Sequence, residues 1–133
     1  MKMIEKTYDG MMDKECIELC NIINSLPGLE TTESCCGHGK GPYMIFFKVK
    51  ISKVGLFVLT RSIDKRYWEF GHIWNISLYV GDCFINKRLP IKYILSSNKS
   101  VGEKAYKEAN SLVQNIKDHI AHENFRKYYK LKL

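Results

Sequence analysis

The sequence has 133 residues, of which 45% are hydrophobic and 26% charged, and its formal net charge is +7. This length fits a single domain over 1–133, because two domains would each be too small to bury a useful core. The apolar and aromatic content excludes a disordered chain, and no stretch approaches the roughly 18 apolar residues of a membrane span. Residues 1–14 lack a continuous hydrophobic core, so we expect no secretory signal.

The cysteines indicate the redox compartment. There are five of them, and Cys35 and Cys36 are adjacent. A secreted disulfide framework normally uses an even number of well-spaced cysteines. We therefore expect a protein of the reducing cytoplasm.

Positive charge is concentrated in the middle of the chain. Residues 1–39 have three basic against seven acidic side chains, whereas residues 40–99 have eleven against three and residues 100–133 have seven against four. A basic central block indicates an anionic partner such as a nucleotide, a nucleic acid or a phosphate. The alternative is that surface lysines only keep the protein soluble.

The first half of the chain alternates helical and extended patterns. Apolar residues at helical spacing predict a helix over 14–26, with Asp13 as its N-cap and with Cys16 and Cys20 on its buried face. Pro27 and Gly28 end this helix. A short strand over 29–34 and a stronger one over 43–51 flank a loop over 35–42, so we expect an antiparallel hairpin. A second helix then runs from a cap at 52 to about 64.

The second half gives two strands and a long helix. Alternation over 73–80 predicts a strand with one buried face, followed by a turn at 81–82 and a strand over 91–95. Ser100 and Glu103 form an S-x-x-E capping box, which predicts the start of the last helix. Its apolar face is kept by Ala105, Ala109, Leu112, Val113, Ile116 and Ile120. The order αββαββα predicts an α+β fold, an antiparallel sheet of four or five strands with helices mainly on one face.

The loop around residues 34–40 combines glycines with several side chains that can bind a ligand or react. Glycines let the backbone approach a ligand, and successive N–H groups can converge on an anion. His38 and Lys40 would add positive charge there. We therefore predict an anion-binding loop, and the alternative is a glycine-rich hairpin turn without a ligand. The residues of this loop are Ser34, Cys35, Cys36, Gly37, His38, Gly39 and Lys40.

The same loop admits two other interpretations. Cys35 and His38 have the C-x-x-H spacing of metal ligands, and Cys83 and His72 could complete a zinc site. Because no second C-x-x-C or H-x-x-x-H pair exists, we predict no bound metal and no cofactor. Cys35 and His38 could also act as nucleophile and base, but nothing identifies an acyl substrate. We therefore expect no catalysis.

Cations and aromatic residues follow each other at the end of the second predicted helix. An arginine can grip a phosphate while an aromatic ring stacks on a base. Arg61, Arg66 and Trp68 are therefore expected to complete the ligand site. The alternative is a solvated helix end with Trp68 packed under the sheet.

These motifs carry a family resemblance. Residues 24–39, NSLPGLETTESCCGHG, resemble small proteins of bacteriophages and other mobile elements that share a Leu-Pro-Gly and a Glu-Ser-Cys-x-Gly-His loop. The aromatic strand at 43–47, the Arg-x-x-Asp-x-Arg-Tyr segment at 61–67 and Gly-Glu-Lys-Ala-Tyr at 102–106 match the same family, which implies no established activity. Thr32, Ser34, Cys35 and Gly37 also resemble the Thr-x-Ser-Ser-Cys-Ser-Gly-Arg loop of the wybutosine-synthesis methyltransferase family. That likeness implies a nucleotide or RNA ligand, although His38 stands where that family has arginine.

Residues and resemblance together indicate a binding protein. We expect a phage-type accessory protein that sequesters a small anionic ligand, above all a nucleotide or cyclic nucleotide defence signal, without catalysis. One alternative is an enzyme of RNA or nucleotide modification that uses Cys35 and His38, and another is a protein–protein inhibitor of a host factor. RNA is a second candidate partner. We expect a homo-oligomer in the host cytoplasm and no membrane partner.

Overall fold

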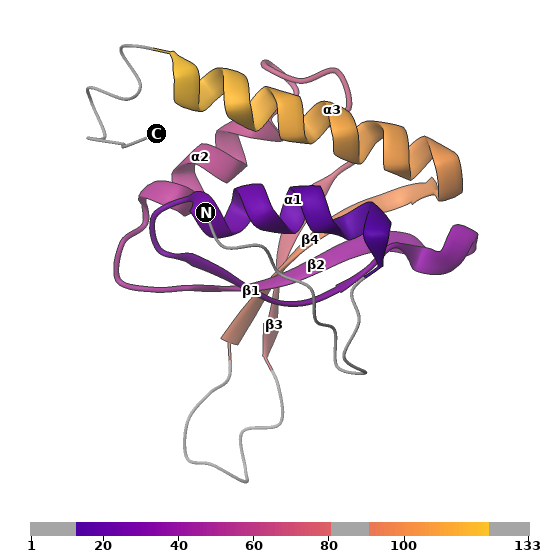
Figure 1. Cartoon of the computed structure of the whole chain (residues 1–133), viewed down its shortest axis with the longest axis horizontal. Helices are drawn as coiled ribbons and strands as arrows, with labels where there is room; N and C mark the ends of the chain where they lie inside the picture. Colours follow the sequence, from indigo (N-terminus) through magenta and orange to yellow (C-terminus); the bar gives the residue numbers. More distant parts are fainter. Residues whose placement is uncertain (1–12, 81–90, 123–133) are drawn as a thin grey trace, which may run out of the picture.

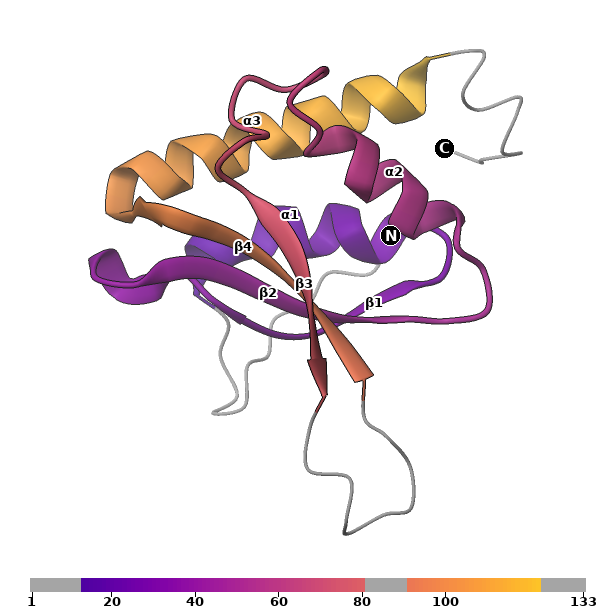
Figure 2. The ribbon, with the colours of Figure 1, turned by 180° about the vertical axis from the view of Figure 1, so that it is seen from behind.

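The structure, a computed structural model, describes residues 13–80 and 91–122. Four antiparallel strands form one sheet in the order β1-β2-β4-β3, and three α-helices cover the same face of it (Figures 1 and 2). The predicted α+β class and the order αββαββα are confirmed. The elements are α1 (Lys14–Ser25), β1 (Leu29–Cys35), the 3-10 turn η1 (Gly37–Gly39), β2 (Pro42–Val49), α2 (Val54–Ser62), β3 (Asn75–Val80), β4 (Ile91–Val101) and α3 (Gly102–Ala121).

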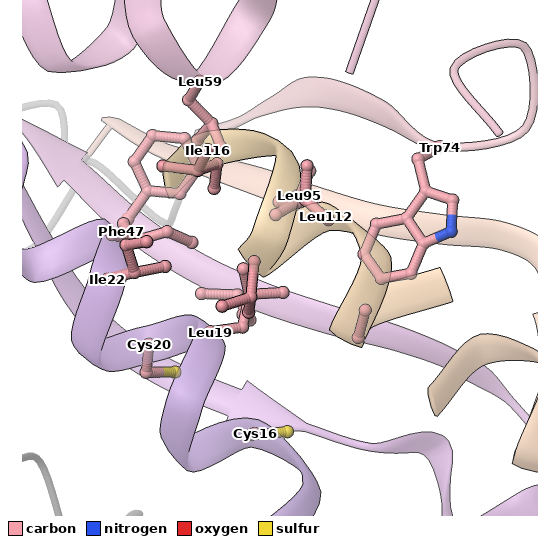
Figure 3. Packing of buried hydrophobic residues seen from close by; sticks show 14 of the residues in the cluster. Cys16, Leu19, Cys20, Ile22, Phe47, Leu59, Trp74, Leu95, Leu112 and Ile116 are labelled. Carbon is pink, nitrogen blue, oxygen red and sulfur yellow. The ribbon is translucent and has the colours of Figure 1, made fainter. Parts of the chain in front are cut away.

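The core lies between the sheet and the helices, as periodicity predicts. In β2, Tyr43, Ile45 and Phe47 are fully buried, whereas the residues between them are half-buried. Cys16 and Cys20 of α1 are buried as expected, and they lie with apolar residues of α3 above the sheet (Figure 3). Burial of one large apolar side chain stabilises a fold by about 1.5–3 kcal/mol, so this layer holds the elements together.

Strand β3 shows the predicted alternation only over its first residues. Asn75, Ser77 and Tyr79 are exposed on one face, while Ile76 on the other face is half-buried. Leu78 lies on the buried face by pattern but is 63% exposed. In both views the β3–β4 pair extends beyond α1, α2 and α3 at the end where β3 finishes (Figures 1 and 2). The turn predicted at 81–82 lies outside the described residues.

The predicted capping box at the start of α3 is wrong. Ser100 belongs to β4, which runs to Val101, and the helix begins at Gly102 without a side-chain cap. The reason is a pair of hydrogen bonds made by the side chain of Ser97 in β4. Tyr43 N donates to Ser97 Oγ at 2.8 Å, and that hydroxyl donates to the Ser100 carbonyl at 2.7 Å. The Ser97 hydroxyl thus replaces a backbone acceptor, which lets the strand continue past 95 up to the helix.

Within the part of the chain that the structure describes, none of the helices has both the length and the apolar character to cross a membrane.

Gly28 fixes the turn between α1 and β1, and it allows a paired test of packing. Gly28 and Gly39 both have positive φ angles, +85° and +80°. A Cβ on Gly28 would lie 2.0 Å from the Ser52 carbonyl oxygen, whereas a Cβ on Gly39 meets nothing within 4 Å. Gly39→Ala should cost about 1 kcal/mol of the free energy of unfolding, from backbone strain alone. Gly28→Ala should cost about 1–3 kcal/mol more, because the backbone must also move.

Urea unfolding followed by circular dichroism measures both losses. Equal losses in the two variants would contradict the close packing of the turn at Gly28.

Candidate functional site

The β1–β2 connection holds the predicted loop residues together at one end of the sheet. Ser34 and Cys35 end β1, Cys36 is buried beneath the turn, and His38 is exposed at its tip. His38 has a φ of +52°, a left-handed conformation that residues other than glycine seldom adopt. The turn therefore holds the imidazole in a defined place above the start of α1.

The backbone amides of this loop are largely engaged within the protein. Cys36 N donates to Asp13 Oδ2 at 3.0 Å, and Gly37 N donates to Cys35 Sγ at 3.4 Å. The amides of Lys40 and Gly41 both donate to the Gly37 carbonyl at 3.0 Å. A phosphate entering this loop would find few converging donors and would meet the negative charge of Asp13. The geometry therefore favours a cation at this position.

Asp13 is a functional candidate that sequence reasoning missed. One ligand atom each of Asp13, Cys35 and His38 lies within 4.8 Å of the other two. The Asp13 Oδ2 and His38 Nε2 atoms are 3.9 Å apart. The N-cap position of α1 accounts for an aspartate in sequence terms, and Cys35 follows only 22 positions later, which gives no ligand-spacing signal. Of the ligands proposed with them, His72 is exposed and outside this group, and Cys83 lies outside the described residues.

The other thiols of this region are poor nucleophiles. Burial raises the pKa of Cys16 to about 12 and that of Cys20 to about 11. Burial also raises the pKa of Cys36, whose Sγ lies 3.9 Å from His38 Nδ1. These three cysteines are therefore protonated near neutral pH.

Trp68 is buried against other aromatic rings. It is 6% exposed, and its ring packs edge-on against Phe70 at 5.4 Å and Trp74 at 5.8 Å. It offers no stacking surface to a ligand, so the alternative interpretation of a packed tryptophan applies. Tyr67, the preceding residue, is 41% exposed and takes that place on the surface.

Arg66 is occupied by a neighbouring carboxylate. Its guanidinium Nη2 lies 2.9 Å from Asp64 Oδ2, and its backbone N also donates to Asp64 Oδ1 at 2.8 Å. Hydrogen bonds from the Arg66 side chain and then from its backbone lower the pKa of Asp64 to about 2. The charge of Arg66 is therefore largely neutralised.

Arg61 has a different environment. Its guanidinium lies 4.6 Å from the ring centre of Tyr67 and 5.6 Å from that of Phe57, and Nη2 donates to Tyr67 Oη at 2.8 Å. None of the ion pairs in the described part of the chain involves Arg61. The His119 ring packs edge-on against Tyr67 at 5.4 Å, and burial, together with the charge of Arg61, lowers the pKa of His119. Arg61 is thus a cation among aromatic rings.

The loop and the Arg61 region lie at opposite ends of α3 (Figures 1 and 2). Gly102 at the start of the helix is next to Gly39, since a Cβ on Gly102 would lie 3.7 Å from the Gly39 Cα. His119, which contacts Tyr67, is 17 residues further on, or about 25 Å at 1.5 Å per residue. One small ligand cannot touch both regions, so the predicted site residues form two separate sites.

No protein-family model matches the chain, and neither a curated protein nor a solved structure matches it. The resemblance to small phage proteins therefore stays a prediction. Function has to be argued from the two sites.

The Arg66–Asp64 pair gives a prediction about titration. Because the folded-state pKa of Asp64 is lowered, the pair contributes stability above about pH 4, and this contribution is lost as the pH falls through about 2. In Arg66→Ala the pKa of Asp64 should rise towards its ordinary value of about 3.9. Arg61→Ala should raise it less, because Arg61 is the weakest of the influences that lower it.

Carbon-13 NMR titration of the Asp64 carboxyl group measures both pKa values. If the pKa of Asp64 rose more in Arg61→Ala than in Arg66→Ala, the Asp64–Arg66 ion pair described here would be contradicted.

Proposed function

We propose that the protein binds a small anionic ligand that carries an aromatic ring, above all a nucleotide or cyclic nucleotide, and releases it unchanged. The proposed binding surface consists of Phe57, Arg61 and Tyr67, and we call it the Arg61 surface; Arg66 is left out because Asp64 occupies it. The observation that carries the proposal is the Arg61 guanidinium, which has no carboxylate partner in the described part of the chain and lies beside two exposed rings.

The chemistry of this surface fits such a ligand. Guanidinium groups bind phosphate oxygens in a fork geometry, and an aromatic side chain stacks on a base of any identity. Phe57 and Tyr67 are 38% and 41% exposed, so each has ring surface open to a ligand. Arg61 already lies over Tyr67, so its guanidinium needs little reorganisation when a phosphate arrives.

The proposal assigns the loop no role in holding the phosphate, because the loop lies about 25 Å away along α3. Capture of a host defence signal by a phage-type protein rests on the resemblance of the loop sequence alone. Self-association and a location in the cytoplasm stay predictions as well. Binding without turnover is proposed because the groups beside the arginines are already engaged: the Tyr67 hydroxyl accepts from Arg61, and the Asp64 carboxylate is paired with Arg66.

A panel of nucleotides and cyclic nucleotides tests the proposal by calorimetric titration. Arg61→Ala should weaken binding by about 1.5–3 kcal/mol, the usual contribution of a hydrogen bond to a charged group. Tyr67→Ala should lose a further stacking contribution of about 1–3 kcal/mol per base. Recovered ligand should be chemically unchanged when examined by mass spectrometry.

Matched controls separate a specific site from diffuse attraction. Lys99→Ala removes the same charge from an exposed position and should leave affinity almost unchanged. Arg61→Lys keeps the charge but loses the fork, and it should recover only part of the affinity. Equal losses in Lys99→Ala and Arg61→Ala would contradict a specific site, because binding would then follow total charge.

A further inference from the structure

We propose that Asp13, Cys35 and His38 form a zinc site that joins the start of α1 to the β1–β2 loop. The ligand atoms of these residues lie mutually within 4.8 Å. A thiolate, an imidazole and a carboxylate are the three ligand types that zinc takes in proteins, with bond lengths of about 2.0–2.3 Å. This site is independent of the Arg61 surface and neither supports nor requires the proposed function.

The distances suit tetrahedral coordination. Bonds of about 2.0–2.3 Å at tetrahedral angles place neighbouring ligand atoms roughly 3.3–3.8 Å apart. Asp13 Oδ2 and His38 Nε2 are already 3.9 Å apart. The longest separation in the group, at most 4.8 Å, has to shorten by about 1 Å when an ion enters.

Hydrogen bonds from the backbone prepare two of the ligands. Cys36 N donates to Asp13 Oδ2, and Gly37 N donates to Cys35 Sγ. These two hydrogen bonds hold the carboxylate oxygen and the sulfur in fixed orientations, as the outer partners of metal ligands do. On binding, the Cys35 thiol gives its proton to solvent and the sulfur bonds to zinc. The carboxylate and the thiolate together balance the two positive charges of the ion.

The arrangement distinguishes a metal site from a catalytic cysteine relay. In such a relay the imidazole stands between thiol and carboxylate, with a hydrogen bond of about 3 Å to each, so sulfur and carboxylate oxygen are roughly 6 Å or more apart. Here Cys35 Sγ and an Asp13 carboxylate oxygen are within 4.8 Å of each other. The three groups converge on one point, as chelating groups do. His38 has a side chain that is 70% exposed, so water can occupy the fourth position.

This inference revises the prediction of no metal that the C-x-x-H spacing alone gave. The missing ligand comes from the residue before α1, and the fold brings it to the loop. The first turn of α1 is held there because Tyr43 Oη donates to the Glu15 carbonyl at 2.6 Å. Zinc would thus fasten an arrangement that the core already builds.

Cobalt is the probe for the test, because it replaces zinc and reports its ligands by colour. Full-length protein stripped by a chelator should bind one Co²⁺ per chain with a thiolate-to-cobalt charge-transfer band, and Zn²⁺ should displace it. Cys35→Ser should abolish the band. Cys36→Ser and Cys83→Ser should keep it, and these are the matched thiol controls. Circular dichroism checks that each variant is folded.

The oxygen and nitrogen ligands are tested by affinity. Asp13→Asn and His38→Ala should each weaken Zn²⁺ binding at least about tenfold, while His72→Ala, at an exposed histidine outside the group, should not change it. The proposal is overturned if the wild-type protein gives no charge-transfer band. It is equally overturned if Cys35→Ser retains the band, or if Asp13→Asn and His38→Ala bind Zn²⁺ as tightly as wild type.

Discussion

Tyr43 connects the elements that surround the β1–β2 loop. Its side chain is fully buried, its ring packs 5.5 Å from Trp74 and 6.4 Å from Tyr106, and its hydroxyl donates to the Glu15 carbonyl. Its backbone N–H donates to Ser97 Oγ and so supports the last residues of β4, which lead into α3. One residue near the start of β2 thereby positions the start of α1 and the start of α3. Burial raises the pKa of the Tyr43 hydroxyl, which remains a donor at any physiological pH.

The net charge of this protein does not show which cations are available to bind an anion. The described residues include 13 Lys and Arg against 10 Asp and Glu, so more than half of the net charge of +7 belongs to residues outside them. Several of the described cations are also paired, such as Lys92 with Glu33 at 3.1 Å and Lys50 with Glu30 at 3.5 Å. Exposed pairs of this kind contribute little to stability, yet they reduce the local positive field. Of the two arginines in the described part of the chain, Arg66 is paired with Asp64 and Arg61 has no carboxylate partner, a difference that total charge could not reveal.

Periodicity predicted the elements well because burial on one face imposes it. The apolar spacing in α1 and α3 corresponds to a real face of the core, whereas the alternation in β3 does so only at its start, since Leu78 is exposed. The side-chain capping bonds expected at α1 and α3 do not form, because residues distant in the sequence form hydrogen bonds in their place. Ser100 looked like a helix cap, but Tyr43 and Ser97 keep it in a strand. Asp13 looked like a cap, but its carboxylate accepts from Cys36 instead. A single sequence does not reveal these hydrogen bonds, because they join residues that only the folded chain brings together.

The same limit explains why the candidate site divided into two. Sequence reasoning placed Arg61 and the loop in one pocket because both carry suitable chemistry, but only the course of α3 decides their separation. The position of Arg61 is set by close packing at both ends of α2. A Cβ on Gly55 would lie 2.4 Å from the Pro27 carbonyl oxygen, and Asn115 of α3 donates to the Ser62 carbonyl at 2.6 Å. Both ends of α2 are thus fixed by neighbouring elements. A guanidinium on such a rigid element loses little conformational entropy on binding, so this end of the molecule is suited to hold an anion, while the far end, with its converging acid, thiol and imidazole, is suited to a cation.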